Sequence, residues 1–308
     1  MRLLFAGTPD VAVPALDALV ASDHDVIGVV TRPDAPAGRG KRLVASPIAQ
    51  RAAQLGLEVL KPTHPRDLDF QQRLRELAPD CCPVVAYGAL LPEAVLDIPR
   101  HGWVNLHFSL LPRWRGAAPV QRSIIAGDTE TGACVFDIVA ELDAGDVYAE
   151  LRTPIGDRET AGDLLRRLAD QGAHLLTQVM DDLAAGTALA TRQPTEGVTI
   201  APKLTVADAE VDWNAPAVEI DRQIRGCTPA PGAWTTFRGD RFKILTAWPV
   251  TAEPLDPAVL RATKHALQVG TGDGVMELET VQPFGKKAMR APDWARGVSF
   301  GAVERFGG

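Results

Sequence analysis

The first half of the chain alternates short apolar runs with amphipathic segments, and this alternation limits the fold more than any other feature. The run 26–30 is almost continuously apolar, which is typical of a strand buried on both of its faces. The segments between such runs carry apolar residues at helical spacing. Strands that alternate with helices predict βαβ units, which form a largely parallel sheet with right-handed crossovers. We therefore predict an α/β, Rossmann-like domain in which helices cover both faces of a mostly parallel sheet.

The individual elements can be placed by their residue patterns. The predicted strands are 3–6, 26–30, 58–60, 84–87, 104–107, 134–138 and 147–152, and the predicted helices are 13–21, 48–55, 71–77 and 120–126. A longer helix is predicted over 164–183, because leucine, valine and methionine recur there at a spacing of about 3.6 residues. Gly186 ends this helix, since glycine suits the left-handed position that closes a helix.

The sequence changes character after Gly186. Prolines and glycines interrupt the next segment, and little periodicity remains. The elements predicted beyond it are a short helix at 216–225, strands at 234–237, 242–248, 266–269 and 275–281, and a hairpin turn at 271–274. Short strands with Gly-rich turns indicate a small β-barrel, for which an OB-like fold is one candidate. We predict an N-terminal domain at 1–189, a linker at 190–205 and a C-terminal OB-like domain at 206–308.

The composition narrows the class of protein. The chain has 308 residues, of which 46% are hydrophobic and 23% charged, as in ordinary globular proteins that bury a sizeable core. No apolar run approaches the roughly 20 residues that span a bilayer, and the apolar N-terminal stretch stops at Thr8, too early for a signal peptide. The four cysteines lack CxxC or zinc-type spacing. We therefore expect reduced core thiols, no metal and a cytoplasmic location.

Charge is distributed unevenly along the chain. The formal net charge is −7, which argues against nucleic-acid binding as a property of the whole surface. The stretch 32–42 nevertheless holds four basic residues against Asp34 alone, namely Arg32, Arg39, Lys41 and Arg42. A basic loop on an acidic protein indicates a polyanionic partner more sharply than the total charge does.

An Asn-x-His pair stands at the end of the predicted strand 104–107. Because side chains alternate along a strand, Asn105 and His107 lie on the same face, at the carboxyl end where ligands bind in open α/β sheets. A carboxamide and a protonated imidazole can both donate to a developing oxyanion. A lone histidine in this place would more often be structural, but the neighbouring asparagine favours a catalytic role.

Carboxylates follow the next predicted strand, 134–138. Asp143 and Asp146 are both candidates by composition, and we expect their loop to return to the sheet edge that carries His107. A carboxylate beside an imidazole raises its pKa, selects its tautomer and can pass a proton through water. The alternative is that these carboxylates only cap a turn.

A nucleotide-binding dehydrogenase is the obvious alternative for such a fold. The turn after the first strand reads Ala6-Gly7-Thr8-Pro9-Asp10, which lacks the G-x-G-x-x-G pattern, and Pro9 would occupy part of the phosphate loop. The first turn therefore argues against a dinucleotide cofactor.

Three motifs together resemble a known family. Asn105-Leu106-His107, the Ser-Leu-Leu-Pro turn at 109–112 and Leu142-Asp143-Ala144-Gly145-Asp146 are similar to the motifs of the formyltransferases that use 10-formyltetrahydrofolate. The resemblance implies that Asn105, His107 and Asp143 are catalytic. The residues that it places at the folate site are Ser109, Leu110, Leu111 and Pro112, with Tyr87 and Gly88 as further candidates. Glu141 departs from the family pattern, which often has glycine there.

Further blocks narrow the resemblance to the branch of this family whose acceptor is methionine esterified to initiator tRNA. They are the segments 5–10, 36–41, 113–119 and 285–289, so the likeness extends over essentially the whole chain. It implies formylation of the methionine α-amine for translation initiation, with Arg39 reaching the acceptor end of the tRNA. The candidate tRNA-binding residues are Arg39, Lys41, Arg42, Lys203, Lys286 and Lys287.

Two other functions compete with this interpretation. A folate-dependent formyltransferase acting on an amino-sugar nucleotide would share the catalytic residues, but the basic stretch 32–42 favours tRNA. A folate- or tRNA-binding module without activity would not need all three catalytic residue types. Nothing in the sequence demands more than a monomer.

Overall fold

The computed structural model describes residues 1–37, 40, 42–301 and 303–307 and divides into two compact units. The first unit comprises Met1–Gly116, Glu130–Pro154 and Leu165–Ala201. The second unit comprises Ala117–Thr129, Ile155–Leu164 and Pro202–Gly308. The chain therefore passes between the units several times, and how it divides into domains around residues 190–205 stays a prediction.

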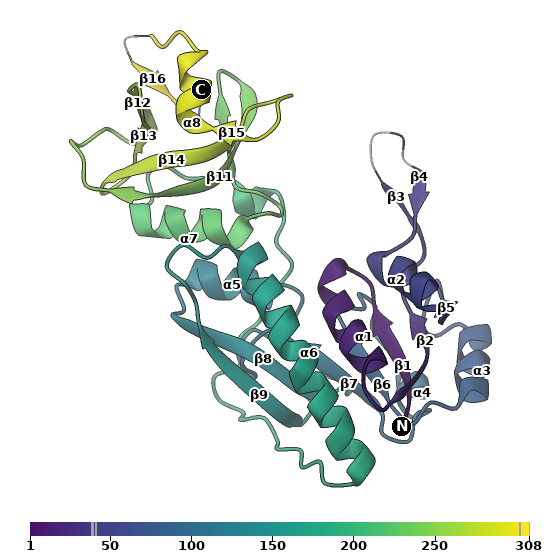
Figure 1. Cartoon of the computed structure of the whole chain (residues 1–308). Helices are drawn as coiled ribbons and strands as arrows, with labels where there is room; N and C mark the ends of the chain where they lie inside the picture. The colour runs from purple at the N-terminus through teal and green to yellow at the C-terminus, as the bar shows by residue number, and fades with distance from the viewer. Residues whose placement is uncertain (38–39, 41, 302, 308) are drawn as a thin grey trace. The chain divides into compact units, whose positions relative to one another are not determined.

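Within the described residues, the first unit contains a seven-stranded sheet in the order β5-β2-β1-β6-β7-β8-β9 (Figure 1). Its strands are β1 (Arg2–Gly7), β2 (Asp25–Val30), β5 (Glu58–Leu60), β6 (Cys82–Val85), β7 (Trp103–His107), β8 (Glu130–Asp137) and β9 (Val147–Pro154). Neighbours from β5 to β7 pair in parallel, whereas β8 and β9 join the edge as antiparallel strands. The predicted mostly parallel, Rossmann-like sheet is thus confirmed.

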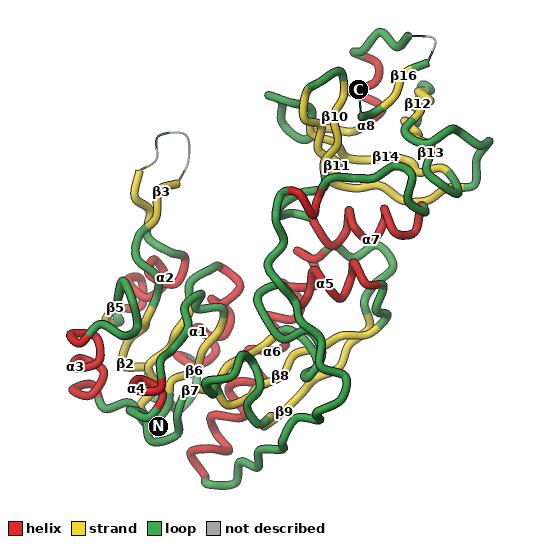
Figure 2. Tube along the Cα trace, turned by 180° about the vertical axis from the view of Figure 1, so that it is seen from behind, coloured by secondary structure: helices red, strands yellow, loops and turns green. Residues whose placement is uncertain are grey.

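Helices connect these strands. They are α1 (Val13–Val20), α2 (Pro47–Leu55), α3 (Leu68–Leu77), α4 (Glu93–Leu96), α5 (Pro119–Ala126) and α6 (Ala161–Ala185), with a 3₁₀ turn at Asp10–Ala12 before α1. Local signals set their ends: the Ser46 hydroxyl accepts a hydrogen bond from the Ala49 amide at the start of α2, and Gly56 closes the same helix at φ +72°. The antiparallel pair β3 (Ala35–Ala37) and β4 (Arg42–Val44) stands out beyond α2 (Figures 1 and 2).

Both faces of the parallel sheet are covered. On one face Phe70 and Leu74 of α3 and Val95 of α4 pack in a cluster with Leu4 and Val84. Strand register places Asn105 on that same face, because Val84 is its partner in β6. On the other face α6 packs closely, and a side chain on Gly172 would lie 2.9 Å from Leu106. The sheet therefore presents Asn105 and His107 on the α3–α4 face and buries Leu106 beneath α6.

The second unit is built around an antiparallel sheet in the order β10-β11-β14-β13-β12-β16, with β15 paired to β14. Its strands are β10 (Trp234–Phe237), β11 (Asp240–Val250), β12 (Val259–Ala262), β13 (Leu267–Gly270), β14 (Val275–Gln282), β15 (Met289–Arg290) and β16 (Glu304–Arg305). A hydrogen bond from the Gly307 amide to the Thr236 carbonyl, 3.0 Å long, joins the two outer strands. The sheet is thus a nearly closed barrel, as predicted, and the expected turn closes with a hydrogen bond from Thr271 to Gly274.

Helices cover this barrel, and aromatic side chains fill it. The helices are α7 (Ala217–Cys227) and α8 (Ala291–Arg296), with a 3₁₀ turn at Ala207–Ala209. Trp213 stacks on Phe306 with ring centroids 5.4 Å apart, and Phe242 lies 4.6 Å from Trp294. The helix α5 also belongs to this unit and approaches α7 so closely that a side chain on Gly226 would meet Ile125.

Several short elements are absent from the sequence-based prediction: α4, α8, β3, β4, β12, β15 and β16. None is longer than six residues, so none carries enough periodicity to be detected. All four cysteines are free and buried, as predicted. Among the helices of the described residues, none combines the length and apolar character that crossing a bilayer requires.

Candidate active site

Strand β7 carries the predicted Asn-x-His pair at its carboxyl end. His107 is 6% exposed, whereas Asn105 is only partly buried. Within the described part of the chain, the Asn105 carboxamide makes no hydrogen bond. Its N–H groups are therefore available to a bound molecule.

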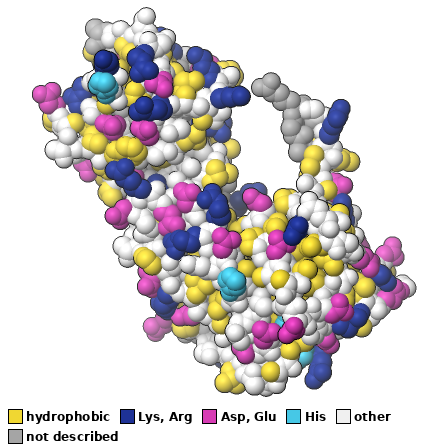
Figure 3. Space-filling view, in the orientation of Figure 1, with side chains coloured by type: hydrophobic (Ala, Val, Ile, Leu, Met, Phe, Trp, Pro, Cys, Tyr) yellow, Lys and Arg dark blue, Asp and Glu magenta, His cyan; other side chains and the backbone are white. Residues whose placement is uncertain are grey.

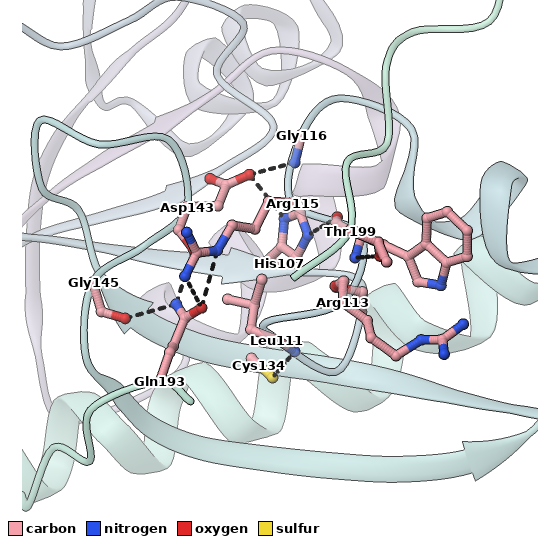
Figure 4. A network of polar contacts seen from close by, with 12 residues as sticks. His107, Leu111, Arg113, Arg115, Gly116, Cys134, Asp143, Gly145, Gln193 and Thr199 are labelled. Atoms are coloured by element: carbon pink, nitrogen blue, oxygen red, sulfur yellow. Dashed lines mark hydrogen bonds and ion pairs between the residues drawn. The ribbon is translucent and has the colours of Figure 1, made fainter. Parts of the chain in front are cut away.

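The His107 ring is held on three sides (Figure 4). Nε2 donates to the Trp114 carbonyl oxygen over 2.9 Å, and Nδ1 lies 3.8 Å from Oδ2 of Asp143. Phe136 meets the ring edge-on with centroids 6.2 Å apart. Because a carbonyl oxygen can only accept, Nε2 carries a hydrogen in either charge state, and the proton that charges the ring is added at Nδ1, facing the carboxylate.

Two opposing effects act on the pKa of His107. Burial lowers it below its ordinary value of 6.5, while the negative charge of Asp143 and the Trp114 carbonyl raise it without offsetting the burial. The ring is therefore a readier proton donor than an exposed histidine. A negative charge that develops nearby would add to the effect of Asp143 and favour the protonated ring.

Asp143 reaches His107 by a different route from the predicted one. We expected strand 134–138 to end at the same sheet edge as His107, but β8 is antiparallel to β7 and ends beside Val104, at the opposite edge. The following loop returns across the sheet, and the Gly116 amide donates to Oδ2 of Asp143 over 2.7 Å. Asp143 adopts φ +48°, which is uncommon for a residue other than glycine.

Asp146 was the other candidate carboxylate. It is exposed, and its backbone carbonyl accepts a hydrogen bond from the Asp137 amide, which closes the base of the loop. Asp143 is thus the carboxylate that faces the histidine.

The Ser-Leu-Leu-Pro turn is packed inward. Ser109 is fully buried, and its hydroxyl donates to the Arg113 carbonyl over 2.7 Å, so it shapes the turn from within. The Leu111 amide lies 3.5 Å from the Cys134 sulfur, and Leu110 packs against β8 near Gly132. Pro112 is half-buried. These contacts attach the turn to β8 beside His107.

Two cavities open on the first unit. One, of about 500 Å³, is lined by Arg32, His64, Arg66 and the segment Gly88–Pro92, so it includes the candidate Gly88. Tyr87 is buried next to it, and within the described residues its hydroxyl has no hydrogen-bond partner. The other, of about 610 Å³, is lined by α4 and by Ile138–Ala140, which lead into the Asp143 loop. Both volumes suit a small-molecule ligand.

The candidate tRNA-binding residues fall in three places. Arg39 and Lys41 lie outside the described residues, and Arg42 is exposed on β4. Lys203 is exposed in the second unit, as are Lys286 and Lys287 between β14 and β15. On the face shown in Figure 3, basic and acidic side chains are interspersed over much of the surface.

Strand register places a cysteine, Cys134, beside His107. Burial raises the pKa of the Cys134 thiol to about 12, so this cysteine, the partner of His107 in the register of β8, is a poor nucleophile. Among the described residues, no group of three or more His, Cys, Asp or Glu side chains could hold a metal ion.

Two residues near the site were missed by the sequence analysis. Arg115 lies within the block 113–119 that carried the resemblance, so a signal for it was present. Gln193 lies in the segment predicted to be a linker, and nothing in the sequence distinguishes it. The structure brings both side chains against the Asp143 loop.

Comparison with known proteins identifies the chain as a formyl transferase, the class of protein to which this fold belongs. Residues 1–180 match the Formyl transferase family, and residues 203–299 match the Formyl transferase C-terminal domain. The chain therefore belongs to the formyl transferase family, which confirms the resemblance found in its motifs.

Curated relatives and solved structures agree with this assignment. The methionyl-tRNA formyltransferase of Streptomyces griseus is 62% identical over 309 residues, with 100% of both chains covered. That of Thermobifida fusca is also 62% identical, with 100% of this chain and 99% of the relative covered.

Among solved structures, an N-formyltransferase from Helicobacter canadensis, complexed with folinic acid and dTDP-3-aminofucose, has a TM-score of 0.69 at 16% identity and covers 92% of this chain and 100% of its own. The methionyl-tRNA formyltransferase from Clostridium thermocellum has a TM-score of 0.57 at 14% identity over 80% of this chain and 92% of its own. At such identities the likeness shows the fold alone.

Proposed function

We propose that this chain transfers the formyl group of 10-formyltetrahydrofolate to the α-amine of methionine esterified to initiator tRNA. The observation that carries the proposal is the buried His107 held between Asp143 and the Trp114 carbonyl, with the free carboxamide of Asn105 on the same strand. This site occurs in a chain that is 62% identical over its whole length to relatives named methionyl-tRNA formyltransferase.

The reaction is an acyl transfer between two nitrogens. The neutral methionine amine attacks the formyl carbon, a new C–N bond forms, and the carbonyl oxygen becomes an oxyanion. Asn105 and the Nδ1–H of protonated His107, which at 3.8 Å makes no hydrogen bond to Asp143, donate hydrogen bonds to that oxygen, whose charge favours the protonated ring. The bond from the carbon to N10 of the folate then breaks, and N10 takes up the proton that the amine has released.

Asp143 has two tasks in this scheme. Its charge faces Nδ1 of His107 and favours the imidazolium, and its carboxylate accepts the proton of the attacking amine through water. The Gly116 amide donates to Oδ2 and so holds the carboxylate at that place. No covalent intermediate on a serine or cysteine is required.

Folate binding is proposed beside this centre. The cavity that includes Gly88 carries two guanidinium groups, Arg32 and Arg66, which suit the carboxylates of a folate tail. The turn from Ser109 to Pro112 is attached to β8 and supports the site by its packing beside His107. The Ser109 hydroxyl is not free for folate, because it already donates to the Arg113 carbonyl. Ser109→Ala is therefore compatible with turnover.

The tRNA is proposed to contact local basic groups, since the net charge of −7 offers no general attraction. Arg42 on β4 and the lysines Lys203, Lys286 and Lys287 are exposed and suited to phosphate contacts. Arg39 and Lys41 belong to the same proposal from the sequence. We further propose that the protein acts as a monomer in the cytoplasm, where initiator tRNA is charged.

An amino-sugar nucleotide is the second candidate acceptor. It is favoured by the fold similarity to the Helicobacter canadensis enzyme, whose structure contains dTDP-3-aminofucose. The 16% identity of that similarity is far below the 62% shared with methionyl-tRNA formyltransferases. We therefore give tRNA the preference.

Formyl transfer to parallel acceptors tests the proposal. The protein is supplied with 10-formyltetrahydrofolate and with methionine-charged initiator tRNA, uncharged tRNA or an amino-sugar nucleotide, either dTDP-3-aminofucose or a 4-amino-sugar nucleotide. Transfer to the charged tRNA alone is expected. Transfer to the sugar nucleotide alone would overturn the acceptor assignment but keep the reaction class, and transfer to none of them would contradict both.

A further inference from the structure

Gln193 is a buried side chain whose hydrogen-bonding capacity is fully used. It is 7% exposed, and its Nε2 donates to the backbone carbonyls of Asp143 and Gly145, each over 2.8 Å. Its Oε1 accepts from Nε and Nη2 of Arg115 over 3.2 and 2.8 Å. One carboxamide thus connects the loop that carries Asp143 to the segment that follows the Ser-Leu-Leu-Pro turn (Figure 4).

Arg115 extends this connection to the start of the same loop. Its Nη1 donates to the Glu141 carboxylate over 3.0 Å, although the Glu141 side chain is 75% exposed. The neighbours of Arg115 touch the catalytic pair directly, since Trp114 accepts from His107 and Gly116 donates to Asp143. Segment 114–116 therefore contacts both His107 and Asp143, and Gln193 holds the loop that carries Asp143.

The segment around Gln193 is itself held by backbone hydrogen bonds. Thr191 exchanges hydrogen bonds with Val147, each over 2.8 Å, on one side of Gln193. On the other side the Arg115 amide donates to the Thr199 carbonyl over 2.9 Å, and the Ala201 amide donates to the Arg115 carbonyl over 2.7 Å. This stretch, predicted as part of a linker, is thus attached to the first unit at residues 191, 193, 199 and 201.

The Asp143 loop needs such support. Asp143 adopts a left-handed backbone conformation, and such conformations persist only where the surroundings impose them. Gly145 approaches the chain so closely that a Cβ there would lie 1.8 Å from the Asp137 carbonyl oxygen. The Gln193 carboxamide donates to the carbonyls of Asp143 and Gly145, on either side of Ala144. It therefore fixes the turn that carries the Asp143 carboxylate.

We infer that Gln193, oriented by Arg115, is a positioning residue that sets the place of the Asp143 carboxylate relative to His107. This inference rests on the proposed function, because it concerns the centre of that reaction. Gln193 touches neither substrate nor the catalytic side chains in this account, and it acts only through the backbone of the loop.

Two substitutions separate positioning from simple packing. Gln193→Met keeps the approximate length of the side chain and removes all four hydrogen bonds, whereas Gln193→Glu keeps acceptors for Arg115 and loses the donors to the loop. Gln178→Met, at an exposed position of α6, is the matched control. Circular dichroism and thermal unfolding verify that each variant is folded, and Gln193→Glu replaces Gln193→Met should the latter not fold.

Steady-state kinetics with methionyl initiator tRNA then provide the readout. For both Gln193 variants we expect kcat to fall on the order of 10–100-fold with KM for tRNA and folate unchanged, as misplacement of a catalytic group produces. In Gln193→Met, the alkaline limb of the kcat–pH profile moves to lower pH, because Asp143 no longer supports the protonated His107 as well. Gln178→Met keeps the wild-type values.

Three results would overturn the inference. They are a wild-type kcat in folded Gln193→Met, a rise of KM alone, or full activity in Gln193→Glu, which would show that the donors to the loop do not matter. Failure of the wild-type protein to formylate any acceptor would instead contradict the proposed function, so failure of the inference and failure of the proposed function are distinguishable.

Discussion

His107 shows how the neighbours of a buried histidine set its pKa and the nitrogen that takes up the charging proton. Burial lowers its pKa, the Trp114 carbonyl keeps a hydrogen on Nε2, and Asp143 faces Nδ1, where the charging proton is added. Without Asp143 the pKa of the ring would lie lower still. The carboxylate is therefore the group whose removal most directly tests the electrostatics of the site.

Asp143→Asn is the residue-scale prediction. Because the carboxylate raises the pKa of His107 and burial lowers it, removing the charge lowers the pKa further below 6.5. The protonated form of His107 is lost as pH rises through its pKa. Because that pKa is lower in the variant, the alkaline limb of the kcat–pH profile moves to lower pH. At neutral pH we expect kcat to fall on the order of 10²–10⁴-fold. Profiles of kcat from acid to alkaline pH check this, and an unmoved alkaline limb would contradict it.

Side chains that belong to one short sequence motif could be predicted, whereas side chains that loops bring together could not. Asn105 and His107 are two residues apart on one strand, so alternation alone places them together. Gln193 binds two backbone carbonyls of a loop far away in the sequence, and no pattern in one sequence predicts such a contact. Ser109 was assigned to folate by resemblance, and its inward hydrogen bond depends on the shape of the turn.

For the strands of the sheet, direction decides how Asp143 reaches His107. The strands 104–107 and 134–138 were recognised from their apolar runs, but periodicity carries no information about whether two strands run parallel. β8 is antiparallel to β7, so Asp143 returns to His107 through a loop instead of emerging beside it. The proximity of Asp143 to His107 was predicted correctly, but the predicted strand direction that was meant to cause it was wrong. The short elements α4, β12 and β16 were missed because a few residues show no measurable period.

Gly132→Ala tests the pairing of β8 with β9. A Cβ on Gly132 would lie 1.9 Å from the Leu151 carbonyl oxygen, which is backbone and cannot move aside alone. We expect the free energy of unfolding to fall by about 1–3 kcal/mol, as for other substitutions that overfill a packed interior. Chemical denaturation measures the change.

Gly297→Ala is the control for that substitution. Gly297 has φ −89°, and the nearest atom to an added Cβ is 3.4 Å away, so the alanine fits. Equal stabilities of Gly132→Ala and the wild type would contradict the antiparallel pairing described here.

At the scale of the whole molecule, an acidic protein has to bind a polyanion through a few basic positions. The formal net charge is −7, and the exposed lysines proposed for tRNA are few. The two-part organisation, with a mostly parallel sheet followed by a barrel, was predictable because strand spacing and turn residues differ between the halves. The return of α5 to the second unit was not, since it depends on packing against α7.

Lys286→Ala and Lys287→Ala test the phosphate contacts. Each substitution is expected to raise KM for methionyl initiator tRNA, to leave KM for the folate unchanged and to reduce the dependence of log KM on log salt by about one unit of slope. Titrations over a range of salt concentrations check both effects. Lys264→Ala removes an exposed lysine elsewhere in the second unit and is the control. If it has the same effect, these two positions have no special role.

Single-turnover formyl transfer by the wild type and by His107→Ala tests whether the centre on β7 transfers a formyl group to charged tRNA. With saturating 10-formyltetrahydrofolate and methionyl initiator tRNA, we expect the wild type to transfer and His107→Ala to be slower on the order of 10²–10³-fold, as for loss of one oxyanion donor. Thermal unfolding and tRNA affinity are measured in parallel to verify that the variant is folded and still binds tRNA. A folded His107→Ala protein that transfers at the wild-type rate would contradict the account.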